Sequence, residues 1–277
     1  MRPEAPSYTA RAAAAHRAAH QLLEGGRIFA DPLAVAMLGE PADAIAADAT
    51  AHPERAAMRR FIALRSWLAE RELADAVARG TRQLVVLGAG LDSFAYRNPH
   101  ADLRVFEVDH PATQAWKRER LAAAGIAVPP TLAFAPVDFA RDALLDALAA
   151  VGFAASAPAL VTWLGVVPYL EDAAIFATLA AIARWARGTQ VVFDYGEPPG
   201  SLPPELAARA AERAARVAAI GEPWLSFFQP AELAARLAAT GFSSVVDLDP
   251  RQLVARFAPE HAAQVPERGG HVVIATV

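Results

Sequence analysis

The sequence predicts an α/β fold in which a mostly parallel sheet is covered by helices on both faces. Three observations lead to this prediction. From residue 81 onward, short apolar runs typical of buried strands alternate with longer helical runs. The first strand candidate ends directly in the turn Gly88-Ala89-Gly90. Residues 1–80 have helical periodicity and few strand signals, so we expect a helical N-terminal region.

The expected elements follow the chain in order. In the N-terminal region, Asp31-Pro32 has the pattern of a helix start, and Phe61, Leu64 and Leu68 share one face of a helix that ends near Gly80. The strand candidates are 83–88, 103–108, 131–135, 159–164, 190–195, 243–248 and 271–277. The helical candidates among them are 111–124, 140–150, 171–186, 204–219 and 230–240.

Composition narrows the class of protein. The 277 residues contain no Gly/Ser-rich linker and no internal repeat, so we predict one domain over 1–277, with a helical cap over 1–80 and an α/β core over 81–277. The net charge of −4 without a basic block argues against a nucleic-acid partner. The sequence has no cysteine, and we find neither an uncharged span of membrane length nor an export signal. We therefore expect a cytoplasmic protein without a membrane partner.

The turn after the first strand indicates a ligand site. Asp109 directly follows the second strand candidate, 21 residues after Gly88, a distance of about one strand-helix-strand repeat. A carboxylate there can accept hydrogen bonds from both hydroxyls of a ribose, which favours an adenosine-containing cofactor. A dinucleotide loop wants a third small residue at the sixth position, where this chain has Ser93 followed by Phe94. S-adenosylmethionine (SAM), which has no phosphate, fits better, although any tight turn after a strand can also use glycine.

Further polar and apolar positions fall at predicted strand ends. Gly88, Asp109, Asp138 and Leu164 all lie where a strand candidate finishes or shortly after it. Open α/β sheets bind ligands at the carboxyl ends of their strands. We therefore expect these four residues to converge in space.

The same segments carry a resemblance to a known family. The matching segments are 86–97, 106–109, 137–139, 163–170 and 241–242, together with Thr9-Ala10, 17–20 and 31–34 near the N-terminus. In this order they resemble the leucine carboxyl methyltransferase family of SAM-dependent enzymes, over nearly the whole chain. The resemblance implies a seven-stranded, Rossmann-like methyltransferase sheet with an antiparallel final strand and an N-terminal helical cap.

The resemblance also implies which residues contact the cofactor. Arg65 would bind the methionine carboxylate, Asp109 the ribose, and Asp138 with Phe139 the adenine. Many members of the family have Glu where this chain has Leu164, so that contact would be lost or made by the backbone. The full set of cofactor positions is Arg65, Gly88, Ala89, Gly90, Asp109, His110, Asp138, Phe139 and Leu164.

Three of these positions have a plainer alternative. Arg65 could be an exposed helix arginine, Asp138 a helix N-cap, and His110 the start of the helix at Pro111.

Residues for the methyl acceptor are less sharply indicated. The candidates are Asp194 and the aromatic residues Tyr169, Tyr195, Trp224 and Phe228, with core or lid packing as the alternative for the aromatic side chains. His16 and His20 share a helix face, but no acidic third ligand is evident nearby, so we expect no metal site.

These inferences favour one function and leave two others open. The favoured function is a SAM-dependent O-methyltransferase that acts on a carboxyl or hydroxyl oxygen of a small molecule and releases S-adenosylhomocysteine (SAH). One alternative is a catalytically silent SAM-binding regulatory module. The other is a nicotinamide-dependent oxidoreductase, against which the missing third glycine counts.

Overall fold

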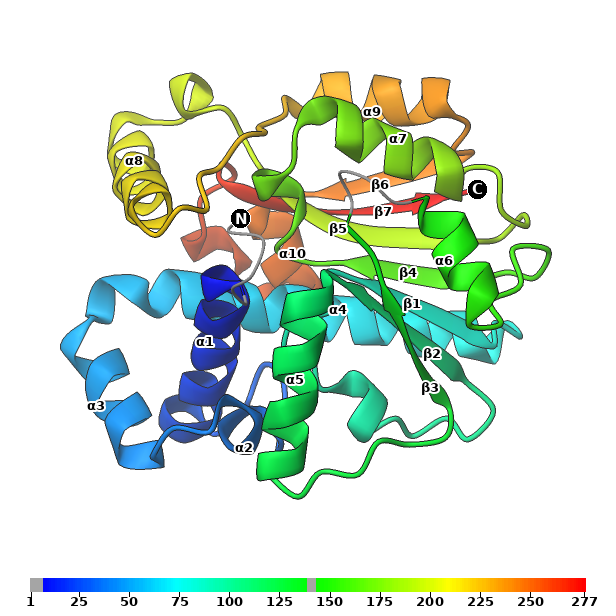
Figure 1. The fold of residues 1–277 in the computed structure, drawn as a ribbon. Coiled ribbons are helices and arrows are strands. Elements are labelled where there is room, and N and C mark those ends of the chain that lie inside the picture. The colour runs from blue at the N-terminus through cyan, green and yellow to red at the C-terminus, as the bar shows by residue number, and fades with distance from the viewer. Residues whose placement is uncertain (1–6, 139–142) are drawn as a thin grey trace.

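The computed structural model describes residues 7–138 and 143–277 and confirms the expected α/β architecture. Within these residues seven strands form one sheet in the order β3-β2-β1-β4-β5-β7-β6 (Figure 1). The first five strands pair in parallel, and β7 runs antiparallel to both β5 and β6. The strands are β1 (Gln83–Leu87), β2 (Arg104–Asp109), β3 (Leu132–Pro136), β4 (Leu160–Trp163), β5 (Gln190–Gly196), β6 (Ser244–Leu248) and β7 (Gly270–Thr276).

Helices cover both faces of the sheet and form the N-terminal region. Helices α6, α7 and α9 cover one face of the sheet, and α4, α5 and α10 cover the other (Figure 1). The α-helices are α1 (Tyr8–Glu24), α2 (Ala34–Leu38), α3 (Ala42–Ala51), α4 (Ala56–Ala78), α5 (Pro111–Ala123), α6 (Leu144–Ala150), α7 (Asp172–Ile182), α8 (Pro204–Ala219), α9 (Pro230–Thr240) and α10 (Pro250–Phe257). Among the described residues, no helix has both the length and the apolar character needed to cross a membrane.

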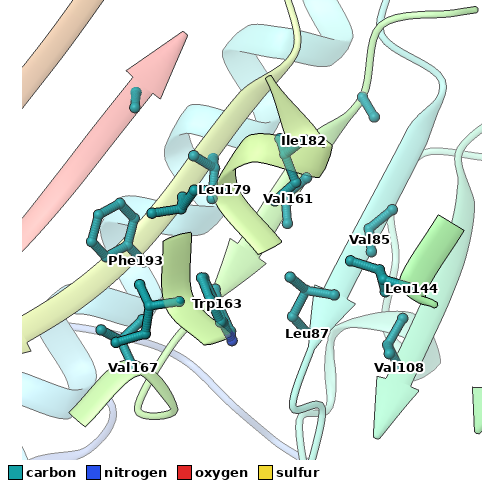
Figure 2. Close-up of a cluster of buried hydrophobic side chains, with 14 of the residues drawn as sticks. Val85, Leu87, Val108, Leu144, Val161, Trp163, Val167, Leu179, Ile182 and Phe193 are labelled. Carbon is teal, nitrogen blue, oxygen red and sulfur yellow. The ribbon is translucent and has the colours of Figure 1, made fainter. Parts of the chain in front are cut away.

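Side chains that alternate along each strand point to opposite faces of the sheet and pack into two separate hydrophobic cores. On β1, Val85 and Leu87 pack with α6, α7 and α9, in the cluster that Figure 2 shows around Trp163. Leu84 and Val86 point the other way and pack with α4 and α10. Because both faces are buried, the parallel strands consist of nearly continuous apolar residues.

The N-terminal helices pack on the α/β core through a third cluster. Ala14, Ala18 and Met37 from α1 and α2 contact Leu91, after β1, and Leu121, on α5. The expected cap is thus helical and shares apolar contacts with the rest of the chain.

Two local expectations need correction. The 21 residues from Gly88 to Asp109 suggested a strand-helix-strand repeat, but the β1–β2 connection contains only the 3-10 turn Phe94–Tyr96. Helix α10 was not expected, although its start carries a readable signal. Asp249 accepts a hydrogen bond from the Gln252 amide, the Gln252 side chain accepts one from the Asp249 amide, and Pro250 occupies the first turn.

Candidate functional site

The glycine turn after β1 adopts a conformation that requires glycine. Gly88 and Gly90 have φ angles of 63° and 47°, in the left-handed region. A Cβ on Gly88 would lie 2.3 Å from Cγ2 of Val166, and a Cβ on Gly90 would lie 3.0 Å from Cβ of Ala10. These contacts bring the turn together with the segment after β4 and the start of α1. They explain both glycines without a ligand, so the turn alone does not identify the cofactor.

Asp109 lies at the end of β2 beside this turn, as predicted. Its Oδ2 accepts a hydrogen bond from the Gly90 amide at 2.5 Å, and its Oδ1 accepts one from the His110 amide at 2.7 Å. Burial raises the pKa of Asp109, while the two amides act in the opposite direction. Each carboxylate oxygen keeps a second lone pair, so both can also accept from ligand hydroxyls.

Glu107 shares the strand face of Asp109 but lies deeper. Its side chain is 1% exposed, and its Oε2 lies 2.7 Å from Nζ of the equally buried Lys117. Burial raises the pKa of Glu107 to about 7 despite the charge of Lys117. Glu107 is therefore paired within the protein core. Asp109 is the acid that remains at the carboxyl edge of the sheet, where we expect the ligand, and we call this edge the ligand edge.

The structure also shows where His110 and Asp138, the other residues expected near the adenosine, lie. His110 caps α5, because its Nδ1 accepts from the Ala112 amide at 3.3 Å, as its helix-start alternative predicted. The Val137 amide donates to the Asp109 carbonyl at 2.9 Å, which places Asp138 close to Asp109. Helix α6 has Ala143, not Asp138, at its cap position. Phe139 lies outside the described residues.

Arg65 is a buried residue of α4 and not an exposed helix arginine. It is 7% exposed, and its Nη1 donates to Oδ2 of Asp194 at 2.6 Å. Asp194, on β5, also accepts the Gly165 amide through Oδ1 at 2.6 Å. Among the described residues, the buried Nε of Arg65 has no hydrogen-bond partner. A buried cation with an unused donor is suited to a ligand carboxylate.

Leu164 is a half-buried residue just after β4. It packs against the cluster formed by α4 and the sheet, and it lines a small cavity of about 20 Å³ with Ser66, Glu70 and Asp92. Because a leucine side chain has no hydrogen-bonding group, any polar contact between this position and a cofactor would be made by the backbone.

The four aromatic candidates divide into two pairs. Phe228 and Tyr195 are 5% and 2% exposed and pack on each other, and the Tyr195 hydroxyl donates to Asp247 at 2.6 Å. For these two, the core-packing alternative describes the structure. Tyr169 and Trp224 are half-buried, and Tyr169 lies near enough to Arg65 and Asp194 for those charges to act on its hydroxyl.

A segment that we call the strap (residues 221–226) joins the acceptor side to α1. The Glu222 carboxylate accepts from the amides of Tyr8 and Thr9 at 2.9 and 3.0 Å, and therefore caps the start of α1. Further along the strap, the Leu225 amide donates to the Pro168 carbonyl at 2.7 Å. Since Ala10 of α1 contacts Gly90, the strap, α1 and the glycine turn meet in one place.

The two N-terminal histidines differ in their surroundings. In His20, Nε2 accepts from the Ile28 and Phe29 amides and Nδ1 contacts Glu24, so both ring nitrogens are used within the N-terminal region. Burial and the charge of nearby Arg59 lower the pKa of His16 to about 4. His16 is therefore neutral at pH 7.

Sequence reasoning did not find several of these partners. The pairing of Asp194 with Arg65 spans 129 residues, and the Glu222 cap on α1 spans more than 200. No local pattern signals either contact. Lys117 carries a weak signal, because it lies on the α5 face that includes buried Gln114 and Leu121.

The strand order, the antiparallel β7 and an acid facing a Gly-x-Gly turn define the sheet of the SAM-dependent methyltransferases. A comparison with protein families matches "Leucine carboxyl methyltransferase" over residues 10–183. This match spans more than half of the sequence, and the chain belongs to the leucine carboxyl methyltransferase family. The predicted family is thereby confirmed.

Named relatives agree with this assignment. A Bacillus subtilis protein, provisionally named S-adenosyl-L-methionine-dependent methyltransferase YktD, is 35% identical over 164 residues, 57% of this chain and 53% of that protein. A Mycobacteroides abscessus protein with the same provisional enzyme name is 36% identical over 202 residues, 70% of this chain and 66% of that protein. The chain thus spans about half the length of several curated relatives that it matches.

Solved structures show the same fold. A DUF574 family protein from Streptomyces avermitilis aligns over 94% of this chain and 96% of its own, with a TM-score of 0.56. Its sequence identity of 18% means that this likeness shows the fold alone.

Proposed function

We propose that this chain is a SAM-dependent methyltransferase that transfers the methyl group to an oxygen atom of a small molecule. The observation that carries the proposal is the pair of polar groups at the carboxyl edge of the sheet. Asp109 lies against the glycine turn, and Arg65 keeps an unused donor two strands away beside Asp194 on β5. The names of the relatives support the same cofactor.

These residues fit the two polar ends of SAM. The Asp109 carboxylate suits a ribose diol, and the Arg65 guanidinium suits the carboxylate of the methionine part. SAM supplies a methyl carbon on a sulfonium, and its transfer is an in-line displacement by the acceptor oxygen. The protein then has to hold the acceptor close and on axis and to exclude water. Tyr169, Trp224 and the strap are the elements we assign to the acceptor side.

The geometry favours a carboxylate acceptor over a hydroxyl. Burial raises the pKa of Tyr169, so its hydroxyl keeps its proton, and the Asp194 carboxylate is paired with the Arg65 guanidinium at 2.6 Å. His16, with its pKa lowered to about 4, is a weak base. A carboxylate is ionised at neutral pH and needs no base, whereas an alcohol or phenol gains from one.

The nicotinamide alternative loses further support. A dinucleotide pyrophosphate binds at the N-terminus of the helix that follows the glycine turn. Residues 88–103, all of which the structure describes, contain only the short 3-10 turn Phe94–Tyr96. This connection offers no α-helix N-terminus to a pyrophosphate.

Two measurements test the proposal and its rivals. Isothermal titration should show SAM and SAH binding at 1:1 in the micromolar range, about −8 kcal/mol, with no thermal shift from NAD. Incubation with SAM and a panel of carboxylic acids, phenols and alcohols should then yield SAH and a methyl ester. No binding of SAM or SAH would reject the proposal. Binding without turnover across the panel would favour the silent regulatory module.

A further inference from the structure

Asp194 has a position that the reaction itself does not explain. It is 4% exposed on β5, beside the residues assigned to the acceptor. A carboxylate there could act as a base or contact the ligand. However, one of its oxygens is bound to Arg65 at 2.6 Å and the other to the Gly165 amide at 2.6 Å. Unlike Asp109, which accepts from backbone amides, Asp194 is paired with a cationic side chain of the protein.

Gly165 restricts the same guanidinium from a second direction. Its φ of 72° favours glycine, and a Cβ there would lie 2.6 Å from Nη2 of Arg65. The Arg65 guanidinium therefore rests against the bare backbone of Gly165 while Asp194 holds its Nη1. The ring of Phe61 lies 5.8 Å from the guanidinium carbon and adds a third neighbour.

We infer that Asp194 is a positioning residue that acts through Arg65, and that together with Gly165 it fixes the guanidinium for the carboxylate of the methionine part of the cofactor. This inference rests on the proposed function. A side chain as long as arginine loses much rotamer freedom when it binds, and an ion pair formed before binding reduces that loss. The buried charge of Arg65 also needs a counter-charge to remain inside the protein.

Simple electrostatics predicts the opposite effect of Asp194 on ligand binding. Asp194 neutralises part of the Arg65 charge, so its removal could strengthen the attraction for a ligand carboxylate. If positioning dominates, removal of Asp194 weakens binding; if neutralisation dominates, removal strengthens it. The two effects therefore predict opposite signs.

A pair of ligands isolates the contact in question. SAH and 5′-methylthioadenosine share adenine, ribose and a thioether, but only SAH has the amino-acid part. Affinities for both are measured by titration on the wild type, Asp194→Asn, Arg65→Ala and the double variant. We expect Asp194→Asn to weaken SAH binding by roughly tenfold to hundredfold, the size of a lost hydrogen bond to a charged group. Methylthioadenosine binding should change by less than about twofold, within the scatter for sites that do not interact.

The double variant tests whether Asp194 acts through Arg65. In the Arg65→Ala background, Asp194→Asn should produce no further loss of SAH affinity. An additive loss would mean that Asp194 contacts the ligand directly, and it would overturn the inference. Unchanged or tighter SAH binding by the single variant would overturn it as well. Failure of the wild type to bind either ligand would instead reject the proposed function.

Glu197 provides a matched control. It is a buried carboxylate just after the same strand, 2% exposed, and pairs with Arg268 at 2.5 Å. Glu197→Gln should lower the melting temperature but leave the ratio of SAH to methylthioadenosine affinities unchanged. If this variant alters the ratio as strongly as Asp194→Asn does, general destabilisation explains both and the inference fails.

Discussion

The two ends of the ligand edge of the sheet use their acidic side chains differently. Beside β1 and β2, Asp109 accepts hydrogen bonds from backbone amides, of which the farther one, Gly90, is 19 residues away. Beside β5 and β7, Asp194 pairs with the guanidinium of Arg65, 129 residues away. His271 lies in the same region, between Asp247 at 2.8 Å and Glu197 at 3.3 Å.

The contacts of Asp109 beside β1 and β2 are thus formed within a short stretch of chain, whereas those of Asp194 beside β5 and β7 join remote segments. An amide donor is present at every position except proline, so an acid at the end of β2 finds partners whatever the neighbouring side chains are. A cationic partner must be brought in by the tertiary fold. Substitution of Asp109, which is held by backbone amides, should therefore affect mainly the ligand, whereas substitution of an acid paired with a buried cationic side chain should also affect stability or its pH dependence.

The largest expected effect comes from Glu107, the acid below Asp109. At a pH well above 7, where Glu107 is ionised, Glu107→Gln removes the carboxylate that lies 2.7 Å from the buried Lys117, which should lower the free energy of unfolding by about 3–5 kcal/mol. Urea denaturation measures this loss. Lys117→Met in the Glu107→Gln background should restore most of it, since the pair is then replaced by uncharged side chains. A loss below about 1 kcal/mol would mean that Lys117 reaches water or another acid when Glu107 is neutral.

Next in size is the effect of Asp109 on ligand affinity. Asp109→Asn keeps the shape but removes the charge and one acceptor, so SAH affinity should fall by about 1–3 kcal/mol. Titration calorimetry measures this loss, with Glu107→Gln measured as folded protein under the same conditions as the control. A loss for Glu107→Gln together with full affinity for Asp109→Asn would assign the ribose to the deeper acid.

Glu222 tests whether the strap is tied to α1 as strongly as its geometry indicates. Glu222→Ala removes the acceptor for two amides at a helix start, which should cost about 1 kcal/mol. For a chain of this size the melting temperature should fall by roughly 2–4 °C. Glu222→Gln retains one acceptor oxygen and should lose less. Equal melting temperatures for all three proteins would show that the cap contributes nothing.

The smallest expected effect is the pH dependence at the end of the ligand edge beside β5 and β7. Burial disfavours a charged His271, but the hydrogen bond and charge of Asp247 and the charge of Glu197 outweigh it and raise the pKa of His271. A raised pKa in the folded state stabilises the protein fully below the unfolded value of 6.5, and this contribution is lost as pH rises through the folded value.

A comparison of variants isolates that contribution. The difference in free energy of unfolding between the wild type and His271→Gln should shrink as the pH is raised from 6 toward 9. Glu197→Gln in the wild-type background should make the decline begin at a lower pH, because one of the two facing carboxylates is gone. A difference that stays constant with pH would show that His271 is neutral throughout.

Much of the fold could be predicted because its signals are local. The seven strand candidates agree with the observed strands to within one residue at nearly every end, since apolar runs bounded by turn residues mark strands directly. Asp109 was placed correctly at the end of its strand for the same reason. The unexpected α10 was also locally encoded, in Asp249-Pro250 and Gln252. The helix expected from the Gly88–Asp109 interval failed because a length does not specify what the residues between two strands form.

The residues on the acceptor side were harder to predict, because residues of the same type lie in different environments in the structure. Tyr195 and Tyr169 both follow strand-like runs, yet one is buried against Phe228 and the other is half-buried beside Trp224. Their exposure depends on how α9, the strap and the sheet pack, and no window of sequence contains that information.

The sequence by itself determined the order of the strands along the chain, the glycine turn and the acid beside it. Residues close in the chain and the periods of helix and strand carry these features. Only the tertiary structure decided that Asp194 holds Arg65, that Glu222 caps α1, and that Glu107 is committed to Lys117 while Asp109 remains at the ligand edge. The pairings of Asp194 and Glu107 depend on the burial of charge, which requires a partner within hydrogen-bonding distance, and the Glu222 cap depends on the free amides of a helix start; neither requirement depends on how far along the chain the partner lies.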